Sequence, residues 1–189
     1  AVLLPLLRTS RTYETTRCLG MPQVRHFCAN EGGLMQTFLP YEDFEKSAQV
    51  LDDKRLGKQR SESIIILKTL LGMYEPKKSG RPGGWPNHPA TRMWAGHEVA
   101  LCDYSIEIAN EWIRRGHRDT TLEWFEKCRE DLMPRWFLFN RSVRKPPPWM
   151  GDERVHLSHR SNLLRKEPEH YRQFWPDERD DLPYVWPVE

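Results

Sequence analysis

Charged side chains that could do chemistry gather in one short stretch, LDDKRLGKQRSE, which runs from position 51 to position 62. Its basic residues are Lys54, Arg55, Lys58 and Arg60, with no acid among them. Glu62 follows, just before an apolar segment. In a helix, Arg55, Lys58 and Glu62 would share one face. A carboxylate among cations can orient a nucleophile, move a proton or stabilise a developing cation. The alternative is a solvated helix face with a Lys58–Glu62 ion pair.

A second group of candidate residues surrounds the sequence WPNHP at 85–89. Pro89 suits the first turn of a helix, and a helix N-terminus attracts phosphates. Tryptophans nearby could stack on an extruded base. The alternative is that Asn87 or His88 caps the helix and the tryptophans pack. The candidate nucleic-acid contacts in this group are Trp85, Asn87, His88, Arg92 and Trp94.

His156 and His159 form a third candidate, because two histidines three positions apart on a helix could share a metal ion. No carboxylate or cysteine ligand accompanies them at a suitable spacing. We therefore interpret them as structural or surface histidines, and we expect no metal ion at this pair.

The elements that must position these residues are expected to be helices in a single compact domain. Hydrophobic spacing and capping residues predict helices from Asp43, from Asp52 or Asp53 to Gly72, and from Pro89. The long helix that follows Pro89 should end at Gly116 and bury one stripe, consisting of His97, Leu101, Tyr104, Ile108 and Trp112.

Further helices are expected beyond Gly116. Thr120 and Glu123 have the spacing of a capping box for a helix through Leu132. A basic, proline-rich connector at 133–148 precedes helices at 152–166 and 168–175, and the tail is irregular. No segment alternates with period two, and no repeat is present. The fold class is therefore predicted to be all-α.

Composition limits the possible functions. The chain has 189 residues, 38% of them hydrophobic, and this is enough for one core. Its net charge of +2 arises in the first 34 residues, so binding of nucleic acid could depend only on local basic clusters. The four cysteines include no CxxC pair and are expected to be reduced thiols. No apolar run is long enough to span a bilayer. The sequence has no heptad pattern of a coiled coil, and a monomer is expected.

Residues 1–34 differ from the rest, being rich in arginine and threonine and poor in acids. They are expected to lie outside the folded domain, which spans 35–189. The segment resembles an organellar transit peptide, or it is upstream sequence with Met35 as the true start. An intracellular location is expected in either case, in an organelle if the leader is real.

Several motifs occur in an order that resembles the pyrimidine-dimer DNA glycosylase family of the phage endonuclease V type, in its bacterial branch. The resemblance covers most of 35–174. It rests on the segment from Leu51 to Glu62, on Asn87-His88-Pro89, on the run from Ile108 to Gly116 with Asp119-Thr120, and on Leu157 to Tyr171.

This resemblance implies an all-α fold and a DNA-repair reaction without a cofactor. An N-terminal α-amine attacks C1′ of the damaged nucleotide, an imine forms, and β-elimination cuts the strand. Glu62 would be the essential carboxylate, and Arg55, Lys58 and Arg60 would hold phosphates. The amine would belong to Met35 or Gln36, or a desolvated Lys58 would replace it.

The partner implied by the resemblance is double-stranded DNA with damaged bases. Two other hypotheses remain open from the sequence. One is a nucleic-acid-binding module that keeps this scaffold without catalysis. The other is an unrelated helical interaction protein that uses an acidic face.

Overall fold

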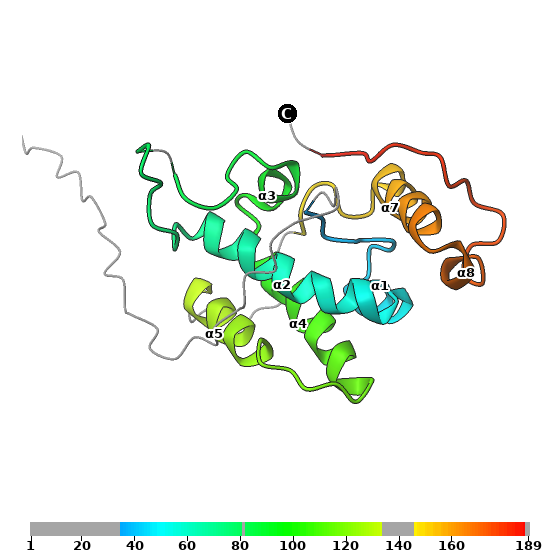
Figure 1. The fold of residues 1–189 in the computed structure, drawn as a ribbon, viewed down its shortest axis with the longest axis horizontal. Coiled ribbons are helices and arrows are strands. Elements are labelled where there is room, and N and C mark those ends of the chain that lie inside the picture. The colour runs from blue at the N-terminus through cyan, green and yellow to red at the C-terminus, as the bar shows by residue number, and fades with distance from the viewer. Residues whose placement is uncertain (1–34, 81, 134–145, 188–189) are drawn as a thin grey trace, which may run out of the picture.

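The computed structural model describes residues 35–80, 82–133 and 146–187, and in these ranges it contains helices and no β-strand (Figure 1). The prediction of an all-α fold is therefore confirmed. The helices are α1 (Phe44–Val50), α2 (Asp53–Leu70), α3 (Pro89–Trp94), α4 (Glu98–Arg114), α5 (Leu122–Leu132), α7 (Glu153–Lys166) and α8 (Pro168–Tyr171).

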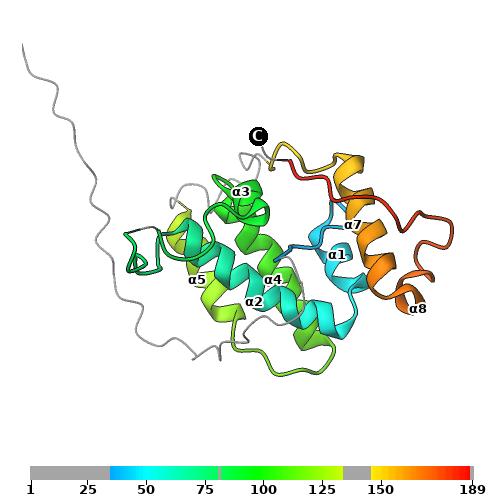
Figure 2. The same ribbon diagram turned by 45° about the horizontal axis from the view of Figure 1, so that its top comes forward.

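Helix α4 is the centre of the helical packing and contacts α1, α2 and α5 (Figure 2). Its buried stripe includes Leu101, Tyr104 and Ile108, none of which is exposed. These positions recur every three or four residues, so one side of α4 faces its neighbours. The packing fixes α2, which carries the charged cluster, against the interior of the protein.

Aspartates begin three of the helices, as the sequence predicts for the first two. The side chain of Asp43 accepts a hydrogen bond from the backbone N–H of Lys46 at 2.8 Å. Asp52 caps α2 in the same way through Arg55, and Asp152 caps α7. These side chains satisfy backbone donors that have no partner within the helix.

The long helix expected from Pro89 to Gly116 is instead two helices. Helix α3 ends at Trp94, and Gly96 has a φ of +80° before α4 begins at Glu98. That left-handed conformation interrupts the helix and is readily adopted only by glycine.

Two predicted helix ends also need correction. The cap of α5 is not the predicted box, because Asp119 accepts hydrogen bonds from the backbone N–H groups of Thr121 and Leu122 at 2.6 and 2.7 Å. Helix α8 ends at Tyr171 rather than near Trp175. The predicted leader at 1–34 and most of the connector at 133–148 lie outside the described residues.

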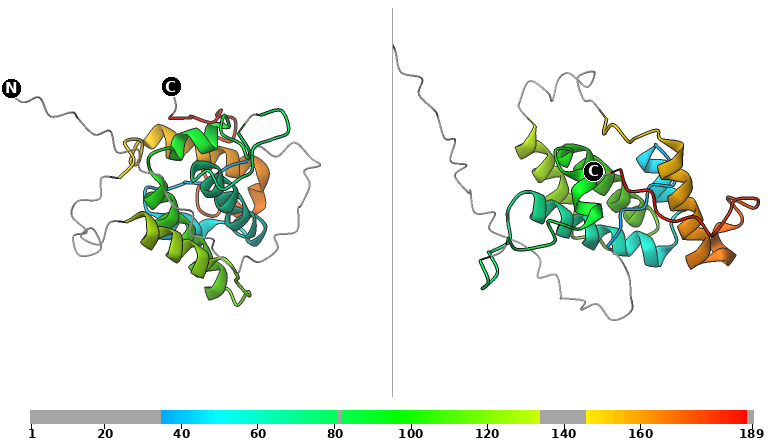
Figure 3. Two further views of the ribbon diagram at one scale, coloured as in Figure 1. Left: turned by 90° about the vertical axis from the view of Figure 1, so that its left-hand side faces the viewer. Right: turned by 90° about the horizontal axis from the view of Figure 1, so that it is seen from above.

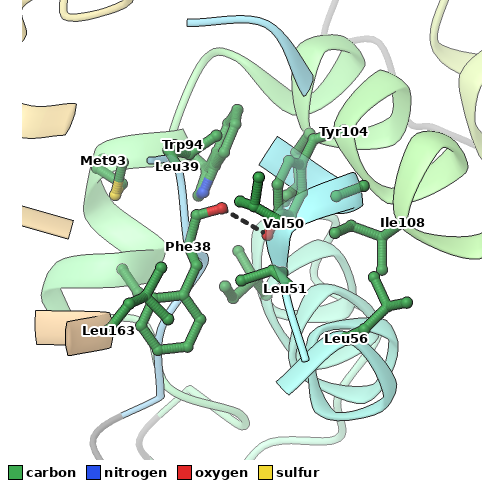
Figure 4. Packing of buried hydrophobic residues seen from close by; sticks show 14 of the residues in the cluster. Phe38, Leu39, Val50, Leu51, Leu56, Met93, Trp94, Tyr104, Ile108 and Leu163 are labelled. Atoms are coloured by element: carbon green, nitrogen blue, oxygen red, sulfur yellow. Dashed lines mark hydrogen bonds between the residues drawn. The ribbon is translucent and has the colours of Figure 1, made fainter. Parts of the chain in front are cut away.

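An extended segment, residues 35–41, runs through the interior between α7 on one side and α2 and α4 on the other (Figures 2 and 4). Phe38 and Leu39 of this segment belong to the hydrophobic core. The hydroxyl oxygen of Tyr104, which carries a single proton, lies 3.1 Å from the Phe38 carbonyl oxygen. An extended chain in a helical core has no ladder of backbone partners, so side chains must supply its hydrogen bonds.

Two further features concern the described residues as a whole. None of their helices is both long enough and apolar enough to cross a membrane. Neither of their cysteines, Cys102 and Cys128, is in a disulfide bond.

Candidate active site

Glu62 is a buried carboxylate on α2 and is only 6% exposed. It accepts a hydrogen bond from Gln59 Nε2 at 2.9 Å and another from the backbone N–H of Gln36, and Lys58 Nζ lies 3.4 Å from its Oε1. Burial nevertheless raises the pKa of Glu62 to about 7 and outweighs these three stabilising partners. The site therefore holds a carboxyl group that can gain or lose a proton near neutral pH.

Gln59 determines where Glu62 lies relative to the extended segment. Its Oε1 accepts from the Phe38 N–H and from the Tyr104 hydroxyl, each at 2.9 Å. Because the amide oxygen already has two donors, the amide nitrogen of Gln59 is the group that donates to Glu62. One side chain thus links the carboxylate, the extended segment and α4. Gln59 could not be identified from the sequence, because a glutamine inside a basic run carries no signal of its own.

Helix α7 holds the other side of the extended segment. His159 Nδ1 accepts from the Leu39 N–H at 2.9 Å, and His156 Nδ1 donates to the Leu39 carbonyl at 2.8 Å. Arg160 donates to the Pro40 carbonyl at 2.9 Å. Burial lowers the pKa of His159 to about 3, so its ring stays neutral. The two histidines therefore position the backbone of the extended segment.

Gln36 brings its backbone nitrogen to the carboxylate of Glu62. Its side chain is 2% exposed, and its amide lies 3.4 Å from Nε2 of His159. Met35 is half-buried and packs against the core. The two residues expected to supply the reactive amine thus lie at the start of the segment that α7, Gln59 and Tyr104 hold in position.

The predicted cations lie at different distances from Glu62. Lys58 is its direct neighbour, but its side chain is 52% exposed, so the desolvated lysine considered from the sequence is not present. Arg55 lies about two turns before Glu62 on α2. Its guanidinium forms an ion pair with Asp52 at 2.6 Å. Lys54 is exposed near the start of the helix.

Arg60 occupies the α2–α4 interface. Its guanidinium lies 2.6 Å from Asp119 and 4.9 Å from the ring centroid of Trp112. Arg60 and Glu62 are two residues apart on the helix, so their side chains point about 200° apart around its axis. Arg60 therefore faces away from the side of Glu62. The structure gives Arg60 a role in packing, and we do not include it among the phosphate contacts.

A basic residue that was not selected from the sequence joins the cluster from α7. Burial is the main cause that lowers the pKa of Lys166. The nearby positive charges of Arg55, Lys58 and Arg165 lower this pKa further, and the negative charge of Glu62 raises it. Lys166 belongs to a basic run that is visible in the sequence, but only the packing of α7 brings it close to α2.

The residues at 85–94 separate into an exposed group and a structural group. Trp85 is 59% exposed, and Asn87 and Arg92 are also exposed. Trp94 is fully buried among the core side chains (Figure 4). Its indole nitrogen donates to Thr37 Oγ1 at 2.9 Å. Trp94 is therefore a core residue, and the prediction that it stacks on an extruded base is wrong for this conformation.

The N-terminus of α3 is not available to a phosphate. His88 caps the helix by accepting the N–H of Ala90 at its Nδ1, and its carbonyl accepts the N–H groups of Thr91 and Arg92. Pro89 has no N–H to offer. The capping role of His88, considered as the alternative from the sequence, is the observed one.

Comparison with known proteins gives one match. The sequence model of a family described as pyrimidine dimer DNA glycosylase matches residues 35–124. The matched range contains the extended segment, the whole of α2 with Glu62, and α4, while α7 and the tail lie beyond it. No curated protein and no solved structure matches the chain. In residues 35–124 the chain is therefore similar to the pyrimidine dimer DNA glycosylase family.

Proposed function

We propose that the protein is a DNA-repair glycosylase that acts on pyrimidine dimers or related base damage and cuts the strand through an imine intermediate. The match of residues 35–124 to the family model supports the glycosylase activity and a DNA substrate. The observation that carries the catalytic part is the hydrogen bond from the Gln36 backbone nitrogen to Glu62, a carboxyl group with a pKa of about 7.

The reaction needs both a proton donor and a proton acceptor. An amine attacks C1′ as the bond between C1′ and the base breaks, and the leaving base takes up a proton. The sugar ring then opens to an imine, and removal of a proton from C2′ expels the 3′ phosphate. A carboxyl group that titrates near the working pH can give the first proton and accept the later one. Its charged form stabilises the cationic sugar. We assign both tasks to Glu62.

The nucleophile is expected to be an α-amine at Gln36 or Met35. An amide nitrogen inside a peptide bond is not nucleophilic, because its lone pair is delocalised. A form of the protein that begins at Gln36 would carry its amine at the position where the amide now contacts Glu62. Lys58 is the less favoured alternative because its side chain is half exposed and so lacks the desolvation that would activate an amine.

The DNA backbone is expected to approach the cations around Glu62. Arg55 and Lys58 of α2 lie near Lys166 of α7. Such a cluster suits phosphates on either side of a damaged nucleotide. The exposed Trp85 offers a second contact, since an indole can stack on any base.

Borohydride trapping on duplex DNA with an abasic site tests this proposal. Borohydride reduces an imine to a stable bond, and mass spectrometry then locates the adduct. The protein beginning at Met35 should give an adduct at its α-amine, and the full chain should give much less. Glu62→Gln should bind DNA and yield no cut strand, while Glu126→Gln, at an exposed glutamate on α5, should behave as the wild type.

The outcomes separate the remaining hypotheses. An adduct at Lys58 would keep the reaction and change the nucleophile. Salt-sensitive DNA binding without any adduct, in either form of the protein, would favour a binding module without catalysis. An absence of DNA binding at low salt would contradict every nucleic-acid function.

A further inference from the structure

The C-terminal segment at 182–187 lies against α7, although it forms no helix of its own (Figures 1 and 3). The backbone N–H of Leu182 donates to Ser161 Oγ at 2.9 Å, and that of Val185 donates to Ser158 Oγ at 3.1 Å. Asn162 donates to the Leu182 carbonyl at 3.1 Å. These hydrogen bonds fix the direction of the tail along the helix that also holds the extended segment.

Between these two attachment points, Tyr184 turns its ring toward the site. Its centroid lies 5.6 Å from that of His159, in an edge-to-face arrangement. His159 in turn contacts both Leu39 and the side chain of Gln36. Tyr184 therefore packs against the ring that holds the segment beginning at Met35.

The hydroxyl of Tyr184 is buried and has no hydrogen-bond partner among the described residues. Buried polar atoms without partners are rare, because each loses its interactions with water and gains nothing in return. The Tyr184 hydroxyl is thus a donor that the described part of the chain leaves unused.

The charges around this hydroxyl belong to the site. Burial is the main cause that raises the pKa of Tyr184. The positive charges of Arg165 and Arg55 lower this pKa, and the negative charge of Glu62 raises it. The phenol stays protonated at neutral pH and can donate a hydrogen bond. Its neighbours are the carboxyl group and the cations that we assign to the damaged nucleotide.

We propose that the tail forms a second wall of the Glu62 site and that the Tyr184 hydroxyl hydrogen-bonds to the nucleotide taken up there, so that it selects damaged over intact DNA. This inference rests on the proposed function. Tyr184 lies outside the range matched by the family, so nothing in that match assigns it a role.

The test measures binding of the full chain to two duplexes. One carries a tetrahydrofuran analogue of an abasic site, which cannot form an imine, and the other is undamaged. Tyr184→Phe keeps the ring and removes only the hydroxyl. We expect it to weaken binding to the analogue about tenfold, the effect of one good hydrogen bond, while binding to undamaged DNA stays the same.

Thermal unfolding distinguishes this effect from a structural one. Loss of an unpaired hydroxyl should leave the melting temperature of Tyr184→Phe unchanged or higher. The control Tyr41→Phe removes a hydroxyl that accepts from Trp175 Nε1 at 3.0 Å. That variant should melt lower and discriminate between the duplexes normally.

Three results would overturn the inference: equal binding of Tyr184→Phe and wild type to the analogue, equal weakening on both duplexes, or a wild type that does not distinguish them. The trapping experiment is independent. A failure to trap any adduct, with the Tyr184 effect intact, would reject the proposed catalysis and retain the binding role of Tyr184.

Discussion

Replacing Glu62 by glutamine should stabilise the protein at high pH, because it removes a charge that the fold buries at a cost. Glu62 is 6% exposed. Its partners Lys58, Gln36 and Gln59 only partly offset the burial, and its pKa is therefore raised to about 7. Glutamine has nearly the same shape and cannot ionise. The variant thus isolates the cost of the charged form.

The magnitude follows from the pKa. The ordinary value for glutamate is 4.5, and the folded value is about 7. At 1.36 kcal/mol for each pKa unit, the charged form costs about 3 kcal/mol in the folded state. The folded protein binds this proton more tightly than the unfolded chain does. The unfolding free energy of the wild type therefore falls as the pH rises through this window.

The difference in unfolding free energy between Glu62→Gln and the wild type should grow by about 2–3 kcal/mol from pH 5 to pH 8. A loss of stability that does not depend on pH, such as that of the hydrogen bond to Gln59, shifts this difference equally at every pH. The change between pH 5 and pH 8 is not affected. Carboxyl groups with lowered pKa values, such as Asp52 and Asp119, titrate in both proteins and cancel.

Urea unfolding followed by tryptophan fluorescence at several pH values measures this difference. Glu126→Gln serves as the control, because this glutamate is exposed on α5. Its difference in unfolding free energy from the wild type should not change with pH. A flat curve for Glu62→Gln, or one that falls with pH, would refute the assignment of a buried, easily protonated carboxyl group. The proposed catalytic role requires that the same variant lose strand cutting.

Three further predictions concern side chains of α2. Gln59→Leu leaves the Phe38 N–H without its partner and removes one of the donors to the Glu62 carboxylate, so it should lower the unfolding free energy by about 2–4 kcal/mol; a change below 1 kcal/mol in urea unfolding would contradict the bridging role. Lys58→Ala should remove about one phosphate contact. The slope of the logarithm of the binding constant for DNA against the logarithm of the salt concentration should then become smaller by about one. Arg60→Ala should lower stability and leave that slope unchanged; the reverse pattern in salt titrations would place Arg60 on the DNA.

Much of the secondary structure could be predicted from the sequence because its signals are local. Asp43 and Asp52 cap helices within three residues of themselves. Lys58 and Glu62 are one turn apart on α2, so their pairing follows from helical spacing alone. The break at Gly96 was missed, since a glycine in a helical pattern can continue the helix or end it.

The properties of the site were decided by tertiary structure, because its partners are distant in the sequence. The pKa of Glu62 depends on burial and on the backbone of Gln36. Arg60 and Trp94 are used in packing because Asp119 and Thr37 meet them across the core. Tyr184 reaches the site only because α7 carries the tail there. Residue types and spacing identified which side chains could do chemistry, but desolvation and long-range contacts determine which of them are placed to do it.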